Sequence, residues 1–510
     1  MDTARTVVLG TSLTIRDVDG VARQMATVQV GADAARRLER SYSFLRQLAQ
    51  AGTPVYGLTT GCGPLAANGI PPERRAEFQR NLIRSHAVSL GPPHPTAFVR
   101  AAMTVRAQVF AQGHSGVDPA TVDLLVGMLN AGVHPIVREV GGVGASGDLV
   151  ELAQIALALI ADGAVAVGSA TLAARDALDA AGMTPLAPRL REGLALMNGT
   201  SFHTGTAAVI LARAQRITAA AQLAAAMILD VLHGNVESLD PALQAARPHA
   251  GQRAVAERVA RVVAGSRLLR HVGDSADSQD AYTLRCIPQM LGPITDALHA
   301  AQAVVEIELN SAIDNPLFLA DERRVVHGGN FHGQPVAMAL DQLKTAMVEL
   351  GVVSERRLAR VLDATLNRGL PPFLIRNSAG LCSGFMGLQY CATAMAADNA
   401  VLAAPTSVRS IPTNANNQDV VSMGMVAARH ARQVIDNVER MIAIELLCAA
   451  QALDLRGVAQ AGTGTQAAHA VIRAHAAPLE EDRPLADDVD TVCRLIDSGA
   501  LVEAVDGVLV

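Results

Sequence analysis

Residues 141–157 read Gly141-Gly142-Val143-Gly144-Ala145-Ser146-Gly147-Asp148-Leu149-Val150-Glu151-Leu152-Ala153-Gln154-Ile155-Ala156-Leu157. Four glycines in the first seven positions allow backbone angles that side chains forbid. The apolar run from Leu149 to Leu157 predicts a helix, which Ser146 or Asp148 could cap. Local structure alone therefore explains the stretch as a glycine-rich turn followed by a capped helix.

The tripeptide Ala145-Ser146-Gly147 also permits a chemical interpretation. The Gly147 amide nitrogen can attack the Ala145 carbonyl carbon and close a five-membered ring across Ser146. Loss of two waters then gives an imidazolone that carries an exocyclic methylidene in place of the serine hydroxyl. Glycine leaves the attacking nitrogen unhindered, and alanine keeps the attacked carbonyl open. Protein side chains offer no strong carbon electrophile, so such a ring would serve as a built-in cofactor.

The composition excludes several classes of partner. The 510 residues carry a net charge of −6 and show no cluster of basic residues, so the sequence predicts neither a nucleic-acid partner nor a membrane partner. Half of the residues are apolar, but only 3% are aromatic and tryptophan is absent. Alanine, leucine and valine must therefore supply the buried surface, which favours long, closely packed helices and large subunit interfaces.

The sequence predicts a cytoplasmic protein without a metal site. Residues 1–6 lack the apolar segment of a signal peptide, and the apolar run Thr204–Leu232 contains charged residues that disfavour a membrane span. Six scattered cysteines have no metal-ligand spacing, which is typical of reduced thiols in the cytosol. The single lysine, Lys344, lies in an ordinary amphipathic run, which argues against a Walker A loop and a pyridoxal phosphate site.

Hydrophobic periodicity predicts a mainly α fold. An N-terminal mixed but mostly helical domain, residues 1–197, carries the 141–148 loop, and residues 198–510 form a bundle of long helices. A strand is expected at 164–170. Helices are expected at 33–50, 73–89, 95–112, 119–130, 202–233, 252–264, 288–312, 334–366, 383–402, 420–455 and 487–498.

Polar residues concentrate in a few loops of this apolar chain. Each loop taken singly could serve only to cap a neighbouring helix. The loops are 55–63, 279–286, 314–316, 328–334 and 410–419.

Taken together, these loops resemble the aromatic amino acid ammonia-lyase and aminomutase family. The shared elements occur in the family's order: Tyr56–Gly61, Asn81–His86, Gly144–Asp148, Asn198–Thr200, Gln279–Arg285, Asn310–Pro316, His327–Gln334 and Asn417–Asp419. The resemblance implies a mostly α-helical homotetramer whose active sites draw residues from more than one subunit. It also implies a cofactor, 4-methylidene-imidazol-5-one (MIO), formed autocatalytically from Ala145, Ser146 and Gly147.

The resemblance also implies roles for individual side chains. Asn198 would hydrogen-bond the imidazolone oxygen, and Tyr56 would take the β-proton of the substrate. A tyrosine can act as that base only if its pKa falls well below about 10, which requires nearby positive charge or hydrogen-bond donors. Arg285 would hold the substrate carboxylate. The other residues implied in the site are Tyr282, grouped with the catalytic side chains, and Gln279, Asn330, Phe331, Asn417 and Gln418.

Substrate choice is expected to depend on Ser85, His86, Tyr390 and Gln418. Histidine-specific members of the family resemble this chain at His86 but carry glutamate at the position of Gln418. Phenylalanine-specific members carry glutamine there but an apolar residue in place of His86. A histidine near a neutral amide suits a phenolic hydroxyl, which both donates and accepts. The sequence therefore predicts an ammonia-lyase that converts L-tyrosine to p-coumarate.

Three alternatives remain open from the sequence. They are a tyrosine 2,3-aminomutase, a histidine ammonia-lyase that forms urocanate, and a catalytically dead helical assembly protein. The loop Val272–Gln279 is short for the family's lid, which favours release of the amine over its return to the substrate. Cys62 replaces a common aromatic residue, and Glu151 and Gln154 replace a common proline and histidine.

Overall fold

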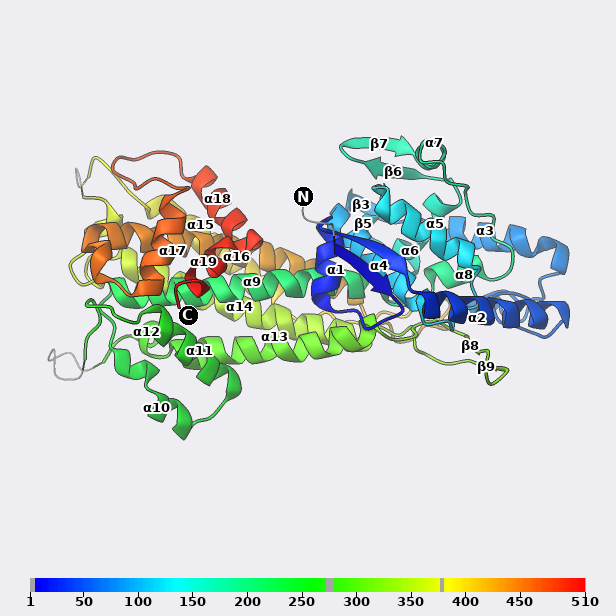
Figure 1. The fold of residues 1–510 in the computed structure, drawn as a ribbon, viewed down its shortest axis with the longest axis horizontal. Coiled ribbons are helices and arrows are strands. Elements are labelled where there is room, and N and C mark those ends of the chain that lie inside the picture. The colour runs from blue at the N-terminus through cyan, green and yellow to red at the C-terminus, as the bar shows by residue number, and fades with distance from the viewer. Residues whose placement is uncertain (1–4, 272–278, 377–379, 510) are drawn as a thin grey trace. The chain divides into compact units, whose positions relative to one another are not determined.

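The computed structural model describes residues 5–271, 279–376 and 380–509, and α-helices dominate it (Figure 1). The predicted mainly α class is confirmed. The helices in the described residues are α1 Ile15–Ala22, α2 Ala32–Gln50, α3 Arg75–His86, α4 Thr96–Ala111, α5 Pro119–Asn130, α6 Leu149–Leu159, α7 Ala174–Ala180, α8 Glu192–Met197, α9 Ser201–Val231, α10 Pro241–Ala246, α11 Ala250–Val262, α12 Tyr282–Arg285, α13 Ile287–Leu309, α14 Gln334–Leu362, α15 Met386–Leu402, α16 Gly424–Arg456, α17 Thr463–Arg473, α18 Ala486–Ser498 and α19 Ala500–Asp506. The strands are β1 Arg5–Leu9, β2 Ala26–Val30, β3 Leu90–Pro93, β4 Val133–Pro135, β5 Arg138–Val140, β6 Ala164–Val167, β7 Ala170–Ala173, β8 Leu317–Leu319 and β9 Arg324–Val326.

The chain forms two compact units, each assembled from three stretches of sequence. The first unit contains Met1–Ala212, Ala301–Asp341 and Pro405–Arg429, and the second contains Arg213–Ala300, Gln342–Ala404 and His430–Val510. Helices α9, α13, α14 and α16 contribute residues to both units. The predicted boundary at residue 197 falls inside the first unit, and the two-domain division stays a prediction.

The strands of the described residues all belong to the first unit, where they form small sheets, and β1 and β4 contact the buried helix α4. β1 and β2 pair in parallel, β4, β6 and β7 form an antiparallel sheet, and β3–β5 and β8–β9 are antiparallel pairs. The predicted strand at 164–170 corresponds to β6. Helix α4 is buried continuously from Phe98 to Ala111. α4 is therefore a core helix, although Arg100, Arg106 and Gln108 are among its buried side chains.

A small hydrophobic cluster lies beneath the loop that carries Tyr56. It consists of Phe44, Leu45, Val55, Leu58 and Phe318. Val55 and Leu58 are 1% and 0% exposed, so both sides of the loop's first turn are anchored in the core. This packing fixes the backbone from which the Tyr56 side chain extends.

Ion pairs join the long helices within the second unit. Arg213 of α9 bonds Asp436 and Glu439 of α16 at 2.7 and 2.9 Å. Arg357 of α14 pairs with Glu445 of α16 at 2.5 Å, and both side chains are fully buried. Buried charges are tolerated in a protein interior when they are paired in this way.

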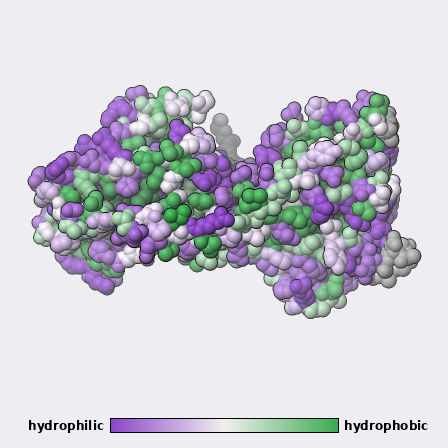
Figure 2. Space-filling view, turned by 180° about the vertical axis from the view of Figure 1, so that it is seen from behind, coloured by the Kyte–Doolittle hydropathy of each residue, from purple (hydrophilic) through white to green (hydrophobic). Residues whose placement is uncertain are grey.

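Large apolar side chains are also exposed in the second unit. In α15 only Ala392 and Asn399 are buried, whereas Tyr390 and Val401 are 65% and 80% exposed. On the face seen in Figure 2, hydrophobic residues reach the surface in several groups among hydrophilic ones. None of the described helices combines the length and apolar character that crossing a membrane requires.

Candidate active site

A cavity of about 1020 Å³ in the first unit collects most of the predicted site residues. Those that line it are Tyr56, Ser85, His86, Ser146, Asn198, Phe331, Asn417 and Gln418. Ala145 and Gly147 line a smaller cavity of about 230 Å³, which shares His86 and Gln418 with the larger one. Segments that are far apart in the sequence therefore meet around the tripeptide 145–147.

Five predicted residues line neither cavity. The Asn330 side chain is exposed and donates to the Ala312 carbonyl at 3.1 Å. The other four, Gln279, Tyr282, Arg285 and Tyr390, belong to the second unit. There the Arg285 guanidinium lies 4.7 Å from the centre of the Tyr282 ring. Most of the predicted lid, residues 272–278, lies outside the described residues.

The backbone of the tripeptide makes a tight turn. Gly144 and Gly147 have φ values of 85° and 83°, and Ser146 has a φ of 50°. Left-handed angles are unusual for a residue with a side chain, and they are found often at functional sites. The Gly147 N–H donates to the Gly144 carbonyl at 3.4 Å, so residues 145 and 146 lie at the corners of the turn.

Gly199 pairs with this turn on one side. The Gly199 N–H donates to the Ser146 carbonyl at 3.0 Å, and the Asp148 N–H donates to the Gly199 carbonyl at 2.8 Å. A Cβ on Gly147 would lie only 2.1 Å from the Gly199 carbonyl oxygen. Packing therefore requires a glycine at position 147, and ring closure requires the same residue. The residues present thus fit the predicted MIO group.

Residues before α16 enclose the other side of the turn. The Met423 N–H donates to the Val143 carbonyl at 3.0 Å. A Cβ on Gly144 would lie 2.2 Å from the Ser422 Oγ. Two glycines of the opening motif are therefore required by close approach of neighbouring segments as well as by their backbone angles.

Asp148 caps a different helix from the one expected. Its side chain makes no capping bond to α6 and instead accepts from the backbone N–H groups of Phe202 and His203 at 2.8 and 2.9 Å. These groups begin α9, where a carboxylate satisfies free N–H donors. Asp148 also bonds His203 Nδ1 at 2.6 Å. Burial lowers the pKa of His203, but the Asp148 charge and bond outweigh it and raise that pKa overall.

Glu151 is a buried acid beside the same loop. Its Oε1 accepts from the Gly142 N–H at 2.8 Å, and its Oε2 has no hydrogen-bond partner among the described residues. Burial, together with the nearby Asp148 charge, raises the pKa of Glu151 to about 8. The carboxyl is therefore mostly protonated at neutral pH and adds little charge next to the turn.

The Tyr56 hydroxyl lies in the cavity and accepts from the Gly63 N–H at 2.7 Å. Burial raises the pKa of Tyr56 above its ordinary value, and the Gly63 bond opposes this only in part. Burial also raises the pKa of the neighbouring Cys62 thiol to about 11. Within this chain Tyr56 is therefore protonated at neutral pH, and its role as a base stays a prediction.

His86 and Gln418 offer complementary hydrogen-bonding atoms to the cavity. His86 Nδ1 lies 2.9 Å from the Leu82 carbonyl, which can only accept, so Nδ1 carries the proton of a neutral ring and Nε2 is the acceptor. Gln418 Oε1 accepts from the Thr413 hydroxyl at 2.8 Å, and its Nε2 donates to Ser146 Oγ at 3.3 Å. The cavity can therefore bind a substrate ring that carries a hydrogen-bond donor.

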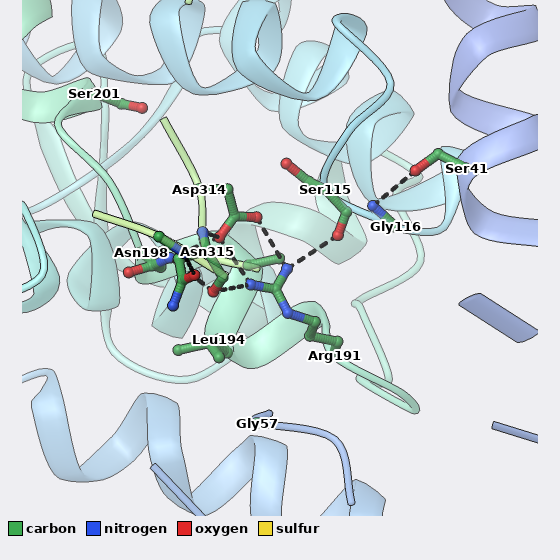
Figure 3. A network of polar contacts seen from close by, with 12 residues as sticks. Ser41, Gly57, Ser115, Gly116, Arg191, Leu194, Asn198, Ser201, Asp314 and Asn315 are labelled. Carbon is green, nitrogen blue, oxygen red and sulfur yellow. Dashed lines mark hydrogen bonds and ion pairs between the residues drawn. The ribbon is translucent and has the colours of Figure 1, made fainter. Parts of the chain in front are cut away.

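Sequence reasoning missed two buried arginines that support the site. Arg106 of α4 donates to the Asn198 carbonyl at 2.8 Å. Arg191 forms a fully buried ion pair with Asp314, which in turn accepts from the Asn198 side chain (Figure 3). Arginine is normally exposed, and no motif marks either position, so only their contacts reveal them.

Substitution of Gly147 tests how closely the turn is enclosed. In Gly147→Ala the new Cβ would meet the Gly199 carbonyl, and the left-handed φ adds strain. We expect the free energy of unfolding to fall by more than about 2 kcal/mol. Gly182→Ala is the matched control, because Gly182 has a φ of 67° but nothing within 4 Å of its Cβ position. Urea unfolding compares the two variants, and equal losses would contradict the enclosed turn.

Glu151→Gln tests the buried acid. The pKa of Glu151 is about 8 in the folded protein and about 4.3 in an unfolded chain. The folded state therefore binds more protons between these values, and the free energy of unfolding falls as the pH rises through them. Glutamine keeps the acceptor for Gly142 but cannot ionise. We expect the variant to lose this slope and to exceed the wild type in stability near pH 8. Urea unfolding at about pH 5 and about pH 8 measures both slopes, and parallel slopes would refute the prediction.

The comparisons with known proteins all indicate the same family. A family model described as aromatic amino acid lyase matches residues 13–474. Histidine ammonia-lyase of Symbiobacterium thermophilum is 45% identical over 502 residues, which cover 98% of each chain. The structure of tyrosine aminomutase from Streptomyces globisporus has a TM-score of 0.94 at 36% identity and covers 99% of this chain and 98% of its own. Histidine ammonia-lyase from Trypanosoma cruzi has a TM-score of 0.91 at 36% identity, with 98% and 95% covered. The predicted resemblance is confirmed, and the chain belongs to the aromatic amino acid lyase family.

Proposed function

We propose that the chain is an ammonia-lyase that acts on an aromatic L-amino acid with a hydrogen-bonding ring, with L-histidine favoured and urocanate as its product. The observation that carries this proposal is His86, whose Nε2 is left as an acceptor by the bond from Nδ1 to Leu82. Both an imidazole N–H and a phenol O–H could donate to it, whereas a phenylalanine ring has no donor. The curated relatives named histidine ammonia-lyase favour histidine over the tyrosine predicted from sequence.

The tripeptide Ala145-Ser146-Gly147 would form the MIO group in its turn. When formed, this group supplies the carbon electrophile that protein side chains lack. The chain's part is to hold the turn between Gly199 and Ser422 so that Ser146 faces the cavity. The Gln418 amide lies within hydrogen-bonding distance of Ser146 Oγ. Gln418 would therefore orient the substrate ring relative to residue 146.

Tyr56 would take the β-proton of the substrate at its hydroxyl oxygen. The Gly63 N–H already bonds that oxygen and would stabilise the phenolate. Burial keeps the pKa of Tyr56 above its ordinary value, so deprotonation needs an added positive charge. We infer that a cation must approach the cavity before Tyr56 can act.

The same cation would bind the substrate carboxylate. Among the described residues that line the larger cavity there is no arginine or lysine. We propose that Arg285 of a neighbouring copy supplies this charge and that Gln279, Tyr282 and Tyr390 accompany it. The exposure of Tyr282 and Tyr390, 68% and 65%, supports burial against another subunit. A homotetramer would complete the site in this way.

L-Tyrosine is the second candidate substrate, and Gln418 is the observation that favours it. A carboxylate would best match an imidazole ring that gains a proton. The neutral Gln418 amide suits a phenol as well as it suits an imidazole. The similarity to tyrosine aminomutase structures is compatible with this alternative. Release of ammonia is favoured over its return to the β-carbon because the curated relatives are named as ammonia-lyases.

The mass of the intact protein tests whether the tripeptide cyclises. Protein with the MIO group is lighter than its sequence mass by two waters, and Ser146→Ala should restore the full mass and abolish turnover. Circular dichroism of Ser146→Ala should match the wild type, because the hydroxyl supports no helix. An unshifted wild-type mass, or full activity in Ser146→Ala, would refute the proposed cofactor.

Product analysis tests the substrate. We expect kcat/KM to decrease in the order L-histidine, L-tyrosine, L-phenylalanine. His86→Leu removes the acceptor and should lower kcat/KM for the first two by about 10- to 100-fold, the cost of one buried hydrogen bond. Turnover of L-phenylalanine should change little, which makes it the internal control. Preference for L-tyrosine would select the second candidate, and preference for L-phenylalanine would overturn the part assigned to His86.

A further inference from the structure

Asp280 is a buried carboxylate that lies just before α12 in the second unit. Its side chain is 1% exposed, and both of its oxygens accept hydrogen bonds. Oδ1 accepts from Arg270 Nη2 at 2.5 Å and from Arg368 Nη2 at 2.9 Å. Oδ2 accepts from the Asn235 N–H at 2.7 Å. A buried charge is stable when it is paired and hydrogen-bonded in this way.

The partners of Asp280 are themselves attached to the ends of long helices. The Arg270 N–H donates to the Gly234 carbonyl at 3.0 Å, just beyond the end of α9. Arg368 follows α14, and its carbonyl accepts from Nη2 of Arg456, the last residue of α16, at 2.8 Å. The Asp280 carboxylate therefore has a fixed place relative to three helices that pack within the second unit.

The surroundings of Asp280 carry an excess of positive charge. Burial lowers the pKa of His233, and three guanidinium charges lower it further against an opposing bond to a backbone carbonyl. These charges belong to Arg270, Arg368 and Arg456. Asp280 is the carboxylate that both Arg270 and Arg368 bond. Its negative charge therefore holds two guanidiniums together that would otherwise repel each other.

Helix α12 begins directly after this anchor and carries Tyr282 and Arg285. With four residues the helix is too short to be stable through its own hydrogen bonds, so its place depends on its contacts. Leu284 is 1% exposed and fixes one side of the helix in the core. The Arg285 N–H donates to the Ala281 carbonyl at 3.1 Å, and Ala281 is bonded directly to Asp280 in the chain.

The Arg285 side chain itself is held only loosely in this chain. Its guanidinium lies 4.7 Å from the centre of the Tyr282 ring, and its Nε is buried without a hydrogen-bond partner among the described residues. A contact between a cation and a ring restrains a guanidinium less strictly than a bidentate carboxylate does. The backbone of α12 therefore largely decides where the Arg285 guanidinium lies.

We propose that Asp280 is a positioning residue, which fixes α12 so that the Arg285 guanidinium meets the substrate carboxylate. This inference rests on the proposed function, because it takes Arg285 as the group that receives the carboxylate. Bidentate binding requires two N–H groups in line with two carboxylate oxygens. A displacement of α12 by about 1 Å would therefore weaken binding of the carboxylate substantially.

A pair of substrate analogues separates positioning from general stability. 3-(Imidazol-4-yl)propanoate carries the carboxylate without the amine, and histamine carries the amine without the carboxylate. Titration calorimetry with the assembled full-length protein gives both Kd values. We expect Asp280→Asn to raise the Kd of the propanoate about tenfold, the size of one hydrogen bond to a charged group. The Kd of histamine should stay within about twofold of the wild-type value.

Asp280→Glu keeps the negative charge and is the variant that should fold normally. Its extra methylene moves the carboxylate relative to the α12 backbone, so it should also raise the Kd of the propanoate and spare histamine. Asp230→Asn is the control, because Asp230 is an equally buried carboxylate of the second unit that accepts from the Gly462 N–H. It should leave both Kd values unchanged. Circular dichroism and size-exclusion chromatography confirm that each variant folds and assembles.

A double-mutant cycle shows whether Asp280 acts through Arg285. Arg285→Met removes the guanidinium and should raise the Kd of the propanoate about tenfold or more. Asp280→Glu added to Arg285→Met should raise it further by less than about twofold, because the group that Asp280 positions is gone. Independent effects that multiply in the double variant would overturn the proposal.

The remaining outcomes are equally decisive. Wild-type affinities in Asp280→Glu would reduce Asp280 to charge compensation for Arg270 and Arg368, and equal weakening of both analogues would reduce it to a structural role; either overturns the proposal. For the alternative substrate, 3-(4-hydroxyphenyl)propanoate and tyramine form the corresponding pair. Wild-type affinity for the propanoates in Arg285→Met, or failure of both pairs to bind the wild type, would refute the proposed function itself.

Discussion

The site depends on the pairing of one glycine backbone with the turn at residues 144–148. Gly199 exchanges hydrogen bonds with Ser146 and Asp148, and its carbonyl lies where any side chain at position 147 would have to be. This pairing joins the start of α6 to the start of α9. Because Asn198 precedes Gly199 directly, the same contact fixes Asn198 relative to Ser146. A rigid backbone of this kind positions polar groups without reorganisation when a substrate binds.

Charge around the turn is mostly paired or suppressed, and the exception is the buried Arg106 guanidinium, which bonds only uncharged acceptors. Arg191 with Asp314 and His203 with Asp148 are fully buried pairs. Glu151 lacks a cationic partner among its hydrogen-bond contacts, and burial keeps it mostly protonated. Uncompensated charge in the interior would cost several kcal/mol, so this arrangement is the stable one. The polarity that faces the cavity comes mainly from oriented neutral groups, such as the amides of Asn198 and Gln418, and Asp419 is the one acidic side chain among the described lining residues.

The sequence predicted most helices and the glycine-rich turn well because their signals are local. Apolar periodicity marks the helices, and the glycines mark the turn. It failed where a contact joins distant segments: Asp148 caps α9, which begins more than fifty residues later, and nothing local announces that bond. Arg106 and Arg191 were missed because burial of a charge depends on its partner. Short strands such as β8 were missed because three residues carry no period. The residues alone could not choose between tyrosine and histidine, because an acceptor at His86 serves a phenol and an imidazole alike.

Two features of the cavity point to the same absent charge. The described lining residues of the first unit include no cation for a carboxylate, and Tyr56 has a pKa above its ordinary value. A single guanidinium near Tyr56 would supply this charge. It would bind the substrate carboxylate in a bidentate manner, and it would lower the pKa of Tyr56 by stabilising the phenolate. In the proposed assembly, Tyr56 would become an active base only when the neighbouring copy and the substrate are in place. Burial would keep Tyr56 protonated until then, so assembly would be a condition for the reaction.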